Sequence, residues 1–333
     1  MHNTSSWQNR RQFIRFGIAL SATALCTPSW SQTASFPQKS IRIVVPFAPG
    51  TGSDVIARTV GQKITEETKQ SVLVENREGG GGIVGTNAVL QAPADGYTLL
   101  MVANPFTIVA GTNLQAPYDP LKDFSPVAKV AIVPIILTMT NELPIHSVKD
   151  LVAYAKANPG KLSYASSGAG TPSQIEMELF KQATGIDIVE VPYKSTAQAM
   201  TDVIGGQIAM YPAAAPLCLP HINSKRVRAI ALFDEQRSAS LPDIPTFPEA
   251  LNIPGYSATP LWYGFVARAG APIVVMQQLH ALVTQAMRSK EVNDRLVALG
   301  AQPIQPTNEE FTAQMAGEIE KARKIAKELG MLK

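Results

Sequence analysis

Short apolar runs alternate with longer stretches of helical spacing along the first hundred or so residues. The runs 41–46, 72–75 and 98–102 are predicted strands, and 54–68 and 83–91 between them carry apolar residues at helical spacing. Strands that alternate with helices in this way are typical of a parallel sheet covered on both faces. The first part of the chain is therefore predicted to be an α/β unit.

The same alternation returns further along the chain. Short apolar strands are predicted at 162–165, 186–191, 207–211 and 227–232, and helices at 147–158, 172–184 and 197–204. A chain of 333 residues is long enough for two domains of ordinary size. The pattern predicts an α/β protein in which each domain is a mainly parallel sheet covered by helices.

Three predicted helices carry clear start signals. Ser147 with Asp150, and Thr307 with Glu310, have the spacing of a capping box, in which each residue bonds the other's backbone N–H. Thr171 is followed by Pro172, which suits the first helical position. Helices are therefore predicted to begin at these three places.

Two glycine-rich loops join a predicted strand to a predicted helix. The first lies in the stretch 44–58, VVPFAPGTGSDVIAR, and the second is the Ser-Ser-Gly-Ala-Gly stretch 166–170. Glycines let a ligand approach the backbone, and free N–H groups at a helix start favour a small anion. The alternative is that the glycines only form tight turns. Because each half of the chain carries one such loop, we expect a ligand held between two domains.

Nucleotide binding is not predicted for the first loop. A dinucleotide fingerprint needs a third glycine where this chain has Val55, and a P-loop needs a lysine, which is absent from 44–62. The two loops contain no Arg or Lys, so their hydroxyl and backbone N–H groups are the expected donors. Asp54 either caps its own helix or faces a ligand, and capping is favoured. The four glycines 79–82 form a third such loop, interpreted as structural.

The first 31 residues are predicted to be an export signal of twin-arginine type. Arg10 and Arg11 precede a short apolar stretch, 16–26, and cleavage is expected near Ser31. The chain has 29 Lys and Arg, three of which lie in this signal, so the remaining 26 equal the 26 Asp and Glu. The mature chain therefore has no net charge, which argues against a nucleic acid partner.

No catalytic motif is present. His146, His221 and His280 are scattered, and Cys218 is the one cysteine outside the signal, in an apolar setting. HExxH, CxxC and GxSxG are all absent. We therefore predict no enzymatic activity, no cofactor and no metal site.

Seven segments of the chain, in the order in which they occur, resemble the periplasmic receptors of tripartite tricarboxylate transporters, the Bug family. The resemblance covers about residues 36 to 333. The segments are VPFAPGTGSDVIAR, VENREGGGGIVG, ADGYTLL, YDPLKDFSPV, NPGKLSYASSGAGTPS, VPYKSTAQAMTDVIGGQI and LPDIPTFPEA. The resemblance implies a two-domain, periplasmic-binding-protein-like (Venus-flytrap) fold that closes on a small organic anion. Domain I is expected to comprise 32–103 and 228–333, and domain II 104–227.

The resemblance also implies which residues bind the ligand. They belong to the first loop, to the second loop and to one further segment of the cleft: Phe47, Ala48, Gly50, Thr51, Gly52, Ser53 and Asp54; Ser166, Ser167, Gly168, Gly170 and Thr171; Tyr193 and Lys194. The chain departs from the common family pattern at 50–53, at Ser195 and at 210–215. Because those positions are expected to face the ligand, the family does not specify which acid is bound.

The implied function is a periplasmic receptor that captures a small carboxylate, organic or aromatic, for membrane transporter subunits. It is expected to act as a monomer. Phe47, Phe106, Tyr193 and Tyr211 are candidates to line an aromatic-friendly cleft, although four such residues are also ordinary packing. One alternative is a ligand-sensing subunit for a membrane kinase. The other is an exported hydrolase or isomerase, against which the missing nucleophile–base motif counts.

Overall fold

The structure is a computed structural model that describes residues 36–113, 116–168, 171–234, 237–238, 241–251 and 261–328. The predicted export signal and Gly170 lie outside these residues. From Lys39 onward the chain forms one compact unit. None of the helices in the described ranges has the length and apolar character needed to cross a membrane.

The first sheet has six strands in the order β11-β4-β10-β3-β1-β2. These strands are β1 (Ile41–Val45), β2 (Val72–Asn76), β3 (Thr98–Ala103), β4 (Phe124–Val133), β10 (Leu261–Arg268) and β11 (Gln302–Pro303). β1 pairs with β2 and β3 in parallel, whereas β10 and β11 pair antiparallel. All six residues of β3 are buried, as expected for a central strand covered on both faces.

The second sheet has five strands in the order β7-β6-β8-β5-β9. They are β5 (Ile135–Met139), β6 (Ser163–Ser166), β7 (Val189–Pro192), β8 (Met210–Ala214) and β9 (Arg228–Leu232). β6 pairs in parallel with β7 and β8, and β5 pairs antiparallel with β8 and β9.

The two-domain α/β class is confirmed, but the expectation of mainly parallel sheets is wrong because both sheets are mixed. The reason lies in the connections between the sheets. β4 runs into β5 with Pro134 alone between them. A parallel pair needs a crossover helix, and strands that arrive directly from the other sheet have none.

The expected boundaries at 103/104 and 227/228 differ from the points where the chain passes between the sheets. β4 falls within 104–227 yet pairs with β10 in the first sheet, and β9 falls within 228–333 yet pairs with β5 in the second. By strand pairing, the second sheet spans Ile135 to Leu232. The division into domains stays a prediction.

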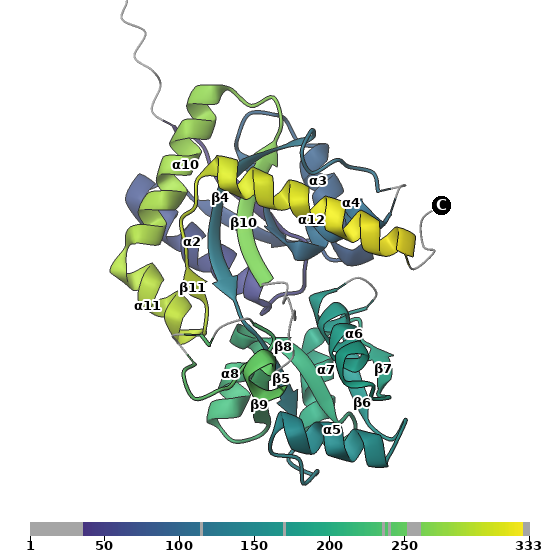
Figure 1. The fold of residues 1–333 in the computed structure, drawn as a ribbon. Helices are drawn as coiled ribbons and strands as arrows, with labels where there is room; N and C mark the ends of the chain where they lie inside the picture. Colours follow the sequence, from purple (N-terminus) through teal and green to yellow (C-terminus); the bar gives the residue numbers. More distant parts are fainter. Residues whose placement is uncertain are drawn as a thin grey trace, which may run out of the picture. The chain divides into compact units, whose positions relative to one another are not determined.

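Figure 1 shows helices on both faces of the first sheet. They are α2 (Gly52–Thr68), α3 (Ile83–Leu90), α4 (Asn104–Thr112), α10 (Ile273–Arg288), α11 (Lys290–Ala298) and α12 (Asn308–Glu328), with the short 3-10 helix η1 (Gly80–Gly82). α2 contacts α10 and α11, and α12 contacts α4 and β4. Trp262 of β10 meets Phe311 of α12 edge to face within a buried apolar cluster of this sheet.

Five helices accompany the second sheet: α5 (Val148–Ala157), α6 (Pro172–Thr184), α7 (Thr196–Ile204), α8 (Ala215–Asn223) and α9 (Phe247–Leu251). Their apolar faces supply buried side chains such as Met177 and Phe180 of α6 and Met200 of α7. Phe180 and Phe247 pack with ring centroids 4.6 Å apart, which joins α6 to α9.

The predicted helix starts are found at Ser147 and Thr307. The Ser147 hydroxyl accepts from the Asp150 N–H at 3.1 Å, and Thr307 and Glu310 exchange both bonds of a capping box, at 3.1 and 2.8 Å. Thr171 occupies the N-cap position before Pro172, but its hydroxyl makes no capping bond. It donates instead to the carbonyl of Gly168 at 2.6 Å.

Candidate functional site

The first glycine-rich loop is a tight turn between β1 and α2. The Ala48 carbonyl accepts from the N–H of Thr51 at 3.4 Å and from its hydroxyl at 2.9 Å. Gly50 has a φ of +80°, a backbone conformation that other residues rarely adopt. α2 begins at Gly52, and the N–H groups of Gly52 and Ser53 have no acceptor among the described residues. Gly52 and Ser53 are buried, so these two N–H groups are unpaired donors at the start of α2.

Asp54 braces this loop. Its carboxylate accepts the N–H of Gly50 at 2.9 Å, the Nε of Arg58 at 2.9 Å and the Nδ2 of Asn76 at 3.0 Å. Asn76 also donates to the carbonyl of Phe47 at 3.0 Å. Burial acts to raise the pKa of Asp54, but the hydrogen bonds from Arg58, Gly50 and Asn76 outweigh it, and the pKa is lowered overall. The carboxylate is thus engaged by the protein, but its backbone partner is Gly50 of the loop and not an N–H group of α2, so the capping role stays a prediction.

The second loop uses its serines in two ways. Ser166 is fully buried, and its hydroxyl donates to Glu190 at 2.6 Å and accepts from the N–H of Gly168 at 3.1 Å. The N–H of Ser167 donates to the hydroxyl of Ser173 at 3.0 Å. The expected donors are therefore already engaged, the Ser166 hydroxyl by Glu190 of β7 and the Gly168 N–H by Ser166, whereas the Ser167 hydroxyl lies beside Tyr211 of β8.

A tyrosine from a neighbouring strand lies against each loop. Tyr263 of β10 lies beside the start of α2, where a Cβ at Gly52 would be 2.6 Å from the Tyr263 hydroxyl oxygen. The Ser53 side chain hydrogen-bonds the Tyr263 hydroxyl. In the other sheet, the hydroxyls of Ser167 and Tyr211 of β8 are 3.1 Å apart. Each loop thus presents one Ser–Tyr hydroxyl pair.

The two pairs lie close to each other although they belong to different sheets. Burial raises the pKa of Tyr211 to about 12 and that of Tyr263 further, and a charge on Tyr211 would add to the rise at Tyr263. Both phenols are therefore neutral near pH 7. The electrostatic interaction between Tyr211 and Tyr263 indicates that the four hydroxyls of Ser53, Tyr263, Ser167 and Tyr211 are neighbours. We call these four residues the hydroxyl cluster.

Tyr263 is a residue that the sequence analysis missed. It lies in Leu-Trp-Tyr-Gly-Phe, a run that is apolar throughout apart from the tyrosine hydroxyl. The tyrosine hydroxyl in an otherwise apolar run could have identified Tyr263 as a candidate, since a buried tyrosine usually has a partner for its hydroxyl. Tyr211 was named only as one of four aromatic candidates, and its hydroxyl is what joins it to the second loop.

The remaining candidates are placed away from the hydroxyl cluster or have other partners. The Tyr193 hydroxyl donates to Asp202 of α7 at 2.7 Å, and Lys194 is exposed. Phe106 stacks on Tyr118 with ring centroids 5.3 Å apart, in the core of the first sheet. Phe106 is thus a packing residue, as the alternative interpretation allowed.

Neutral groups dominate the hydroxyl cluster. The nearby Arg58 is paired with Asp54 at 2.9 Å. No group of three His, Cys, Asp or Glu able to hold a metal ion occurs within the described ranges. Cys218 is buried, and burial raises the pKa of its thiol far above the usual range, which does not suit a nucleophile. The cluster can donate hydrogen bonds to an anion but offers no acid–base pair for catalysis.

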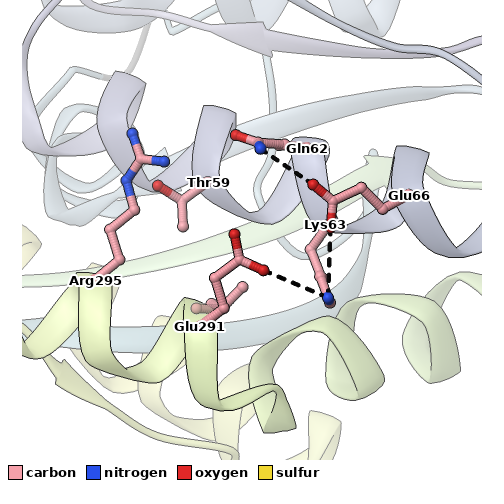
Figure 2. Close-up of a pocket in the computed structure, with 7 residues that line it drawn as sticks. Thr59, Gln62, Lys63, Glu66, Glu291 and Arg295 are labelled. Atoms are coloured by element: carbon pink, nitrogen blue, oxygen red, sulfur yellow. Dashed lines mark hydrogen bonds and ion pairs between the residues drawn. The ribbon is translucent and has the colours of Figure 1, made fainter.

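A small pocket between α2 and α11 lies apart from the loops (Figure 2). Lys63 fills it, with Nζ 3.4 Å from Glu66 and 3.5 Å from Glu291. The pocket volume is about 10 Å³, which is room for one water at most. This ion-pair network joins the two helices and leaves no space for an organic ligand.

The family model for the tripartite tricarboxylate transporter family receptor matches residues 56–331. Protein BugT of Bordetella pertussis (strain Tohama I) is 33% identical over 316 residues, which cover 94% of this chain and 96% of the relative. The family is therefore shown by sequence alone.

Solved structures agree. One described as a periplasmic transporter is 35% identical with a TM-score of 0.82, and an R. palustris protein with adipate is 32% identical with a TM-score of 0.82; each match covers 89% of this chain and 99% of the other. MatC from Rhodopseudomonas palustris with bound malate is 26% identical with a TM-score of 0.79, covering 87% and 100%. The chain belongs to the tripartite tricarboxylate transporter receptor family, whose members are periplasmic solute-binding proteins and not enzymes.

Proposed function

We propose that this protein captures a small carboxylate at the hydroxyl cluster and delivers it to the membrane subunits of a tripartite tricarboxylate-type transporter. The observation that carries the proposal is the meeting of two Ser–Tyr pairs from different sheets, Ser53–Tyr263 and Ser167–Tyr211. A ligand bound there contacts both halves of the protein at once, which is how binding favours a closed form.

The donors fit a carboxylate. A carboxylate oxygen only accepts hydrogen bonds, and the cluster supplies hydroxyls together with the free N–H groups of Gly52 and Ser53. Each hydrogen bond to a charged group contributes roughly 1.5–3 kcal/mol. Three or four of them, less the entropy of association, correspond to a dissociation constant in about the micromolar range.

The relatives support the ligand class and leave the individual acid open. Adipate is a plain aliphatic dicarboxylate and malate a shorter one with a hydroxyl group, so members of this fold hold acids of different length and polarity. This chain carries its own residues at 210–215, including Tyr211. The proposed ligand is therefore an organic acid whose identity these residues select.

The site of action follows from the same family. The twin-arginine-like signal is proposed to direct export, with cleavage near Ser31, and the mature receptor is proposed to act in the periplasm as a monomer. There it releases its ligand to the transporter's membrane subunits.

A thermal-shift screen tests this proposal. Mature protein, residues 32–333, is unfolded, dialysed to remove any bound acid, refolded and melted with aliphatic and aromatic carboxylates at millimolar concentration. A ligand at about 100 times its dissociation constant adds about 2.7 kcal/mol, which raises the midpoint by several degrees. A rise with one acid class and none with the matching amides is expected. Equal midpoints with every acid would contradict carboxylate capture.

A further inference from the structure

β4 is irregular where it faces α10. Its pairing with β10 shifts register twice, so that Val127 and Val130 have no partner on β10. The Val127 carbonyl instead meets the Nδ1 of His280 at 2.7 Å, and the Val130 carbonyl accepts from the N–H of Ile304 at 3.0 Å. Such shifts locally re-aim the strand and are frequent beside functional sites.

A cavity of about 160 Å³ lies beside this part of β4, away from the glycine-rich loops. Its lining comes from β4, α10 and the segment before α12: Ala128, Lys129, Val130, His280, Thr284, Met287, Arg288, Gln305, Pro306 and Thr307. Three of these residues are basic and none is acidic. One water needs about 10–15 Å³ and drug-sized ligands need about 300 Å³ or more, so the cavity suits a small ion or one charged end of a molecule.

His280 and Arg288 of α10 have unused hydrogen-bonding capacity. A carbonyl only accepts, so the contact with Val127 makes Nδ1 of His280 the protonated nitrogen and leaves Nε2 for another group. Arg288 makes a long contact, Nε to Gln305 Oε1 at 3.4 Å, and has no ion pair among the described residues. The carboxylate of Glu310 accepts the Thr307 N–H at 2.8 Å, but Glu310 does not itself line the cavity.

Lys129 is the third basic residue of the lining, although its Nζ contacts α12, outside the cavity. It is 8% exposed, and its Nζ donates to the neutral Gln314 Oε1 at 2.6 Å. Glu318 is the nearest compensating charge, but its oxygens accept from Trp262 and Thr107, and no ion pair joins it to Lys129 in the described ranges. Gln314 links the two side chains, since its Nε2 donates to Glu318 Oε1 at 2.9 Å. Glu318 offsets the burial of Lys129 only in part, and the pKa of Lys129 stays lowered, so a further anion in the adjoining cavity would stabilise the charged form.

We infer that this cavity, lined by Lys129, His280 and Arg288 on the α10 side of β4, is a second binding site that takes a small oxyanion. The shared chemistry is a compact group with several acceptor oxygens, as in phosphate or a carboxylate. Arg288 offers a planar pair of donors to such a group, and Thr284 and Gln305 lie beside it in the lining. This site does not depend on the proposed function of the hydroxyl cluster.

Side-chain NMR of the histidines tests the inference, because the mature chain contains only His146, His221 and His280. Inorganic phosphate is titrated at constant pH and constant ionic strength. A saturable shift of the His280 imidazole signals is expected, with the signals of His146 and His221 unmoved. A linear drift of all three histidines, or no movement of His280, would overturn the inference.

Two arginine variants make the test specific. Arg288→Gln is expected to weaken the phosphate effect on His280 about tenfold or more, because it removes the charged donors of the cavity. Arg295→Gln is the matched control, since it removes the same charge from an exposed arginine on the neighbouring helix α11, outside the cavity. Equal loss in both variants would mean a general charge effect and would contradict the site.

Two further arms identify the anion and separate the two sites. Acetate in place of phosphate tests whether a carboxylate suffices; saturation by either anion supports the oxyanion site, and saturation by neither overturns it. The phosphate titration is repeated with Gly52→Val, which obstructs the hydroxyl cluster. The His280 shift is expected to persist there, and its loss would show that His280 reports on the first site.

Discussion

The two glycine-rich loops share one local fold and differ in what they offer a ligand. In each, a threonine at the N-cap donates its hydroxyl to the carbonyl three residues earlier, Thr51 to Ala48 at 2.9 Å and Thr171 to Gly168 at 2.6 Å. Each helix then carries a serine at its second position. Ser53 of α2 reaches Tyr263, whereas the hydroxyl of Ser173 of α6 accepts from Ser167 inside its own loop.

The difference shows that a similar sequence pattern does not supply the same donors. The first loop leaves the backbone N–H groups of Gly52 and Ser53 free within the described residues, because they are the first N–H groups of α2 and the Asp54 carboxylate bonds Gly50 instead. In the second loop, the N–H groups of Ser167 and Gly168 already donate to the hydroxyls of Ser173 and Ser166. What this loop offers a ligand is the side-chain hydroxyl of Ser167, which lies beside that of Tyr211. We expect the first loop to contribute most of the binding energy.

Gly52→Val should have the largest effect on the first loop. Its Cβ would lie 2.6 Å from the Tyr263 hydroxyl and its side chain would cover the free N–H groups. Loss of two charged hydrogen bonds predicts a drop in affinity of roughly a hundredfold or more by calorimetry. Gly317→Val on α12, where an added Cβ meets nothing within 4 Å, is the control. Unchanged affinity in Gly52→Val would remove the first loop from the site.

Removing one hydroxyl from each half should have a smaller effect and compares the loops directly. Tyr263→Phe and Tyr211→Phe each delete one donor, and each is expected to weaken carboxylate binding about tenfold or more. Tyr118→Phe is the control, because its hydroxyl donates to the Phe106 carbonyl at 3.1 Å within the core. A loss in Tyr118→Phe as large as in the other two would mean that the effect comes from stability and not from contact.

Asp54→Asn should weaken binding least and change stability most visibly. It leaves donors on the loop without a carboxylate, at a cost of about 1–3 kcal/mol near pH 7. Because the pKa of Asp54 is lowered on folding, its contribution is complete above the unfolded value of about 3.9 and is lost as the pH falls through the folded value. Melting curves from pH 7 to pH 3 should therefore converge for wild type and variant. A constant gap over this range would contradict the brace.

Sequence patterns predicted the parts of the fold that depend on local order. β1, α2, β6 and α6 lie close to their predicted ranges, because strand–loop–helix units carry their signals in consecutive residues. β4, β5 and β10 were not predicted. The apolar run around β4 and β5 is broken by Pro126 and Pro134, and β10 is buried along its whole length except Arg268, so neither shows a period.

The same limit holds for the candidate site, whose local loops were predicted and whose long-range contacts were not. The loops were found, but the engagement of Ser166 with Glu190 depends on the parallel pairing of β6 and β7. Tyr263 contacts Ser53 because β10, which follows all strands of the second sheet in the sequence, belongs to the first sheet. Contacts between residues so distant in sequence depend on the topology of the sheets, which a short sequence motif does not predict.

The most direct test of carboxylate binding between the two halves at the hydroxyl cluster is a crystal structure of the mature protein. The crystals should contain the acid that raises its melting point most. We expect one carboxylate group within hydrogen-bond distance of both halves, through Ser53 or Tyr263 on one side and Ser167 or Tyr211 on the other. A carboxylate bound by a single half, or held by an arginine or lysine away from the hydroxyl cluster, would contradict it.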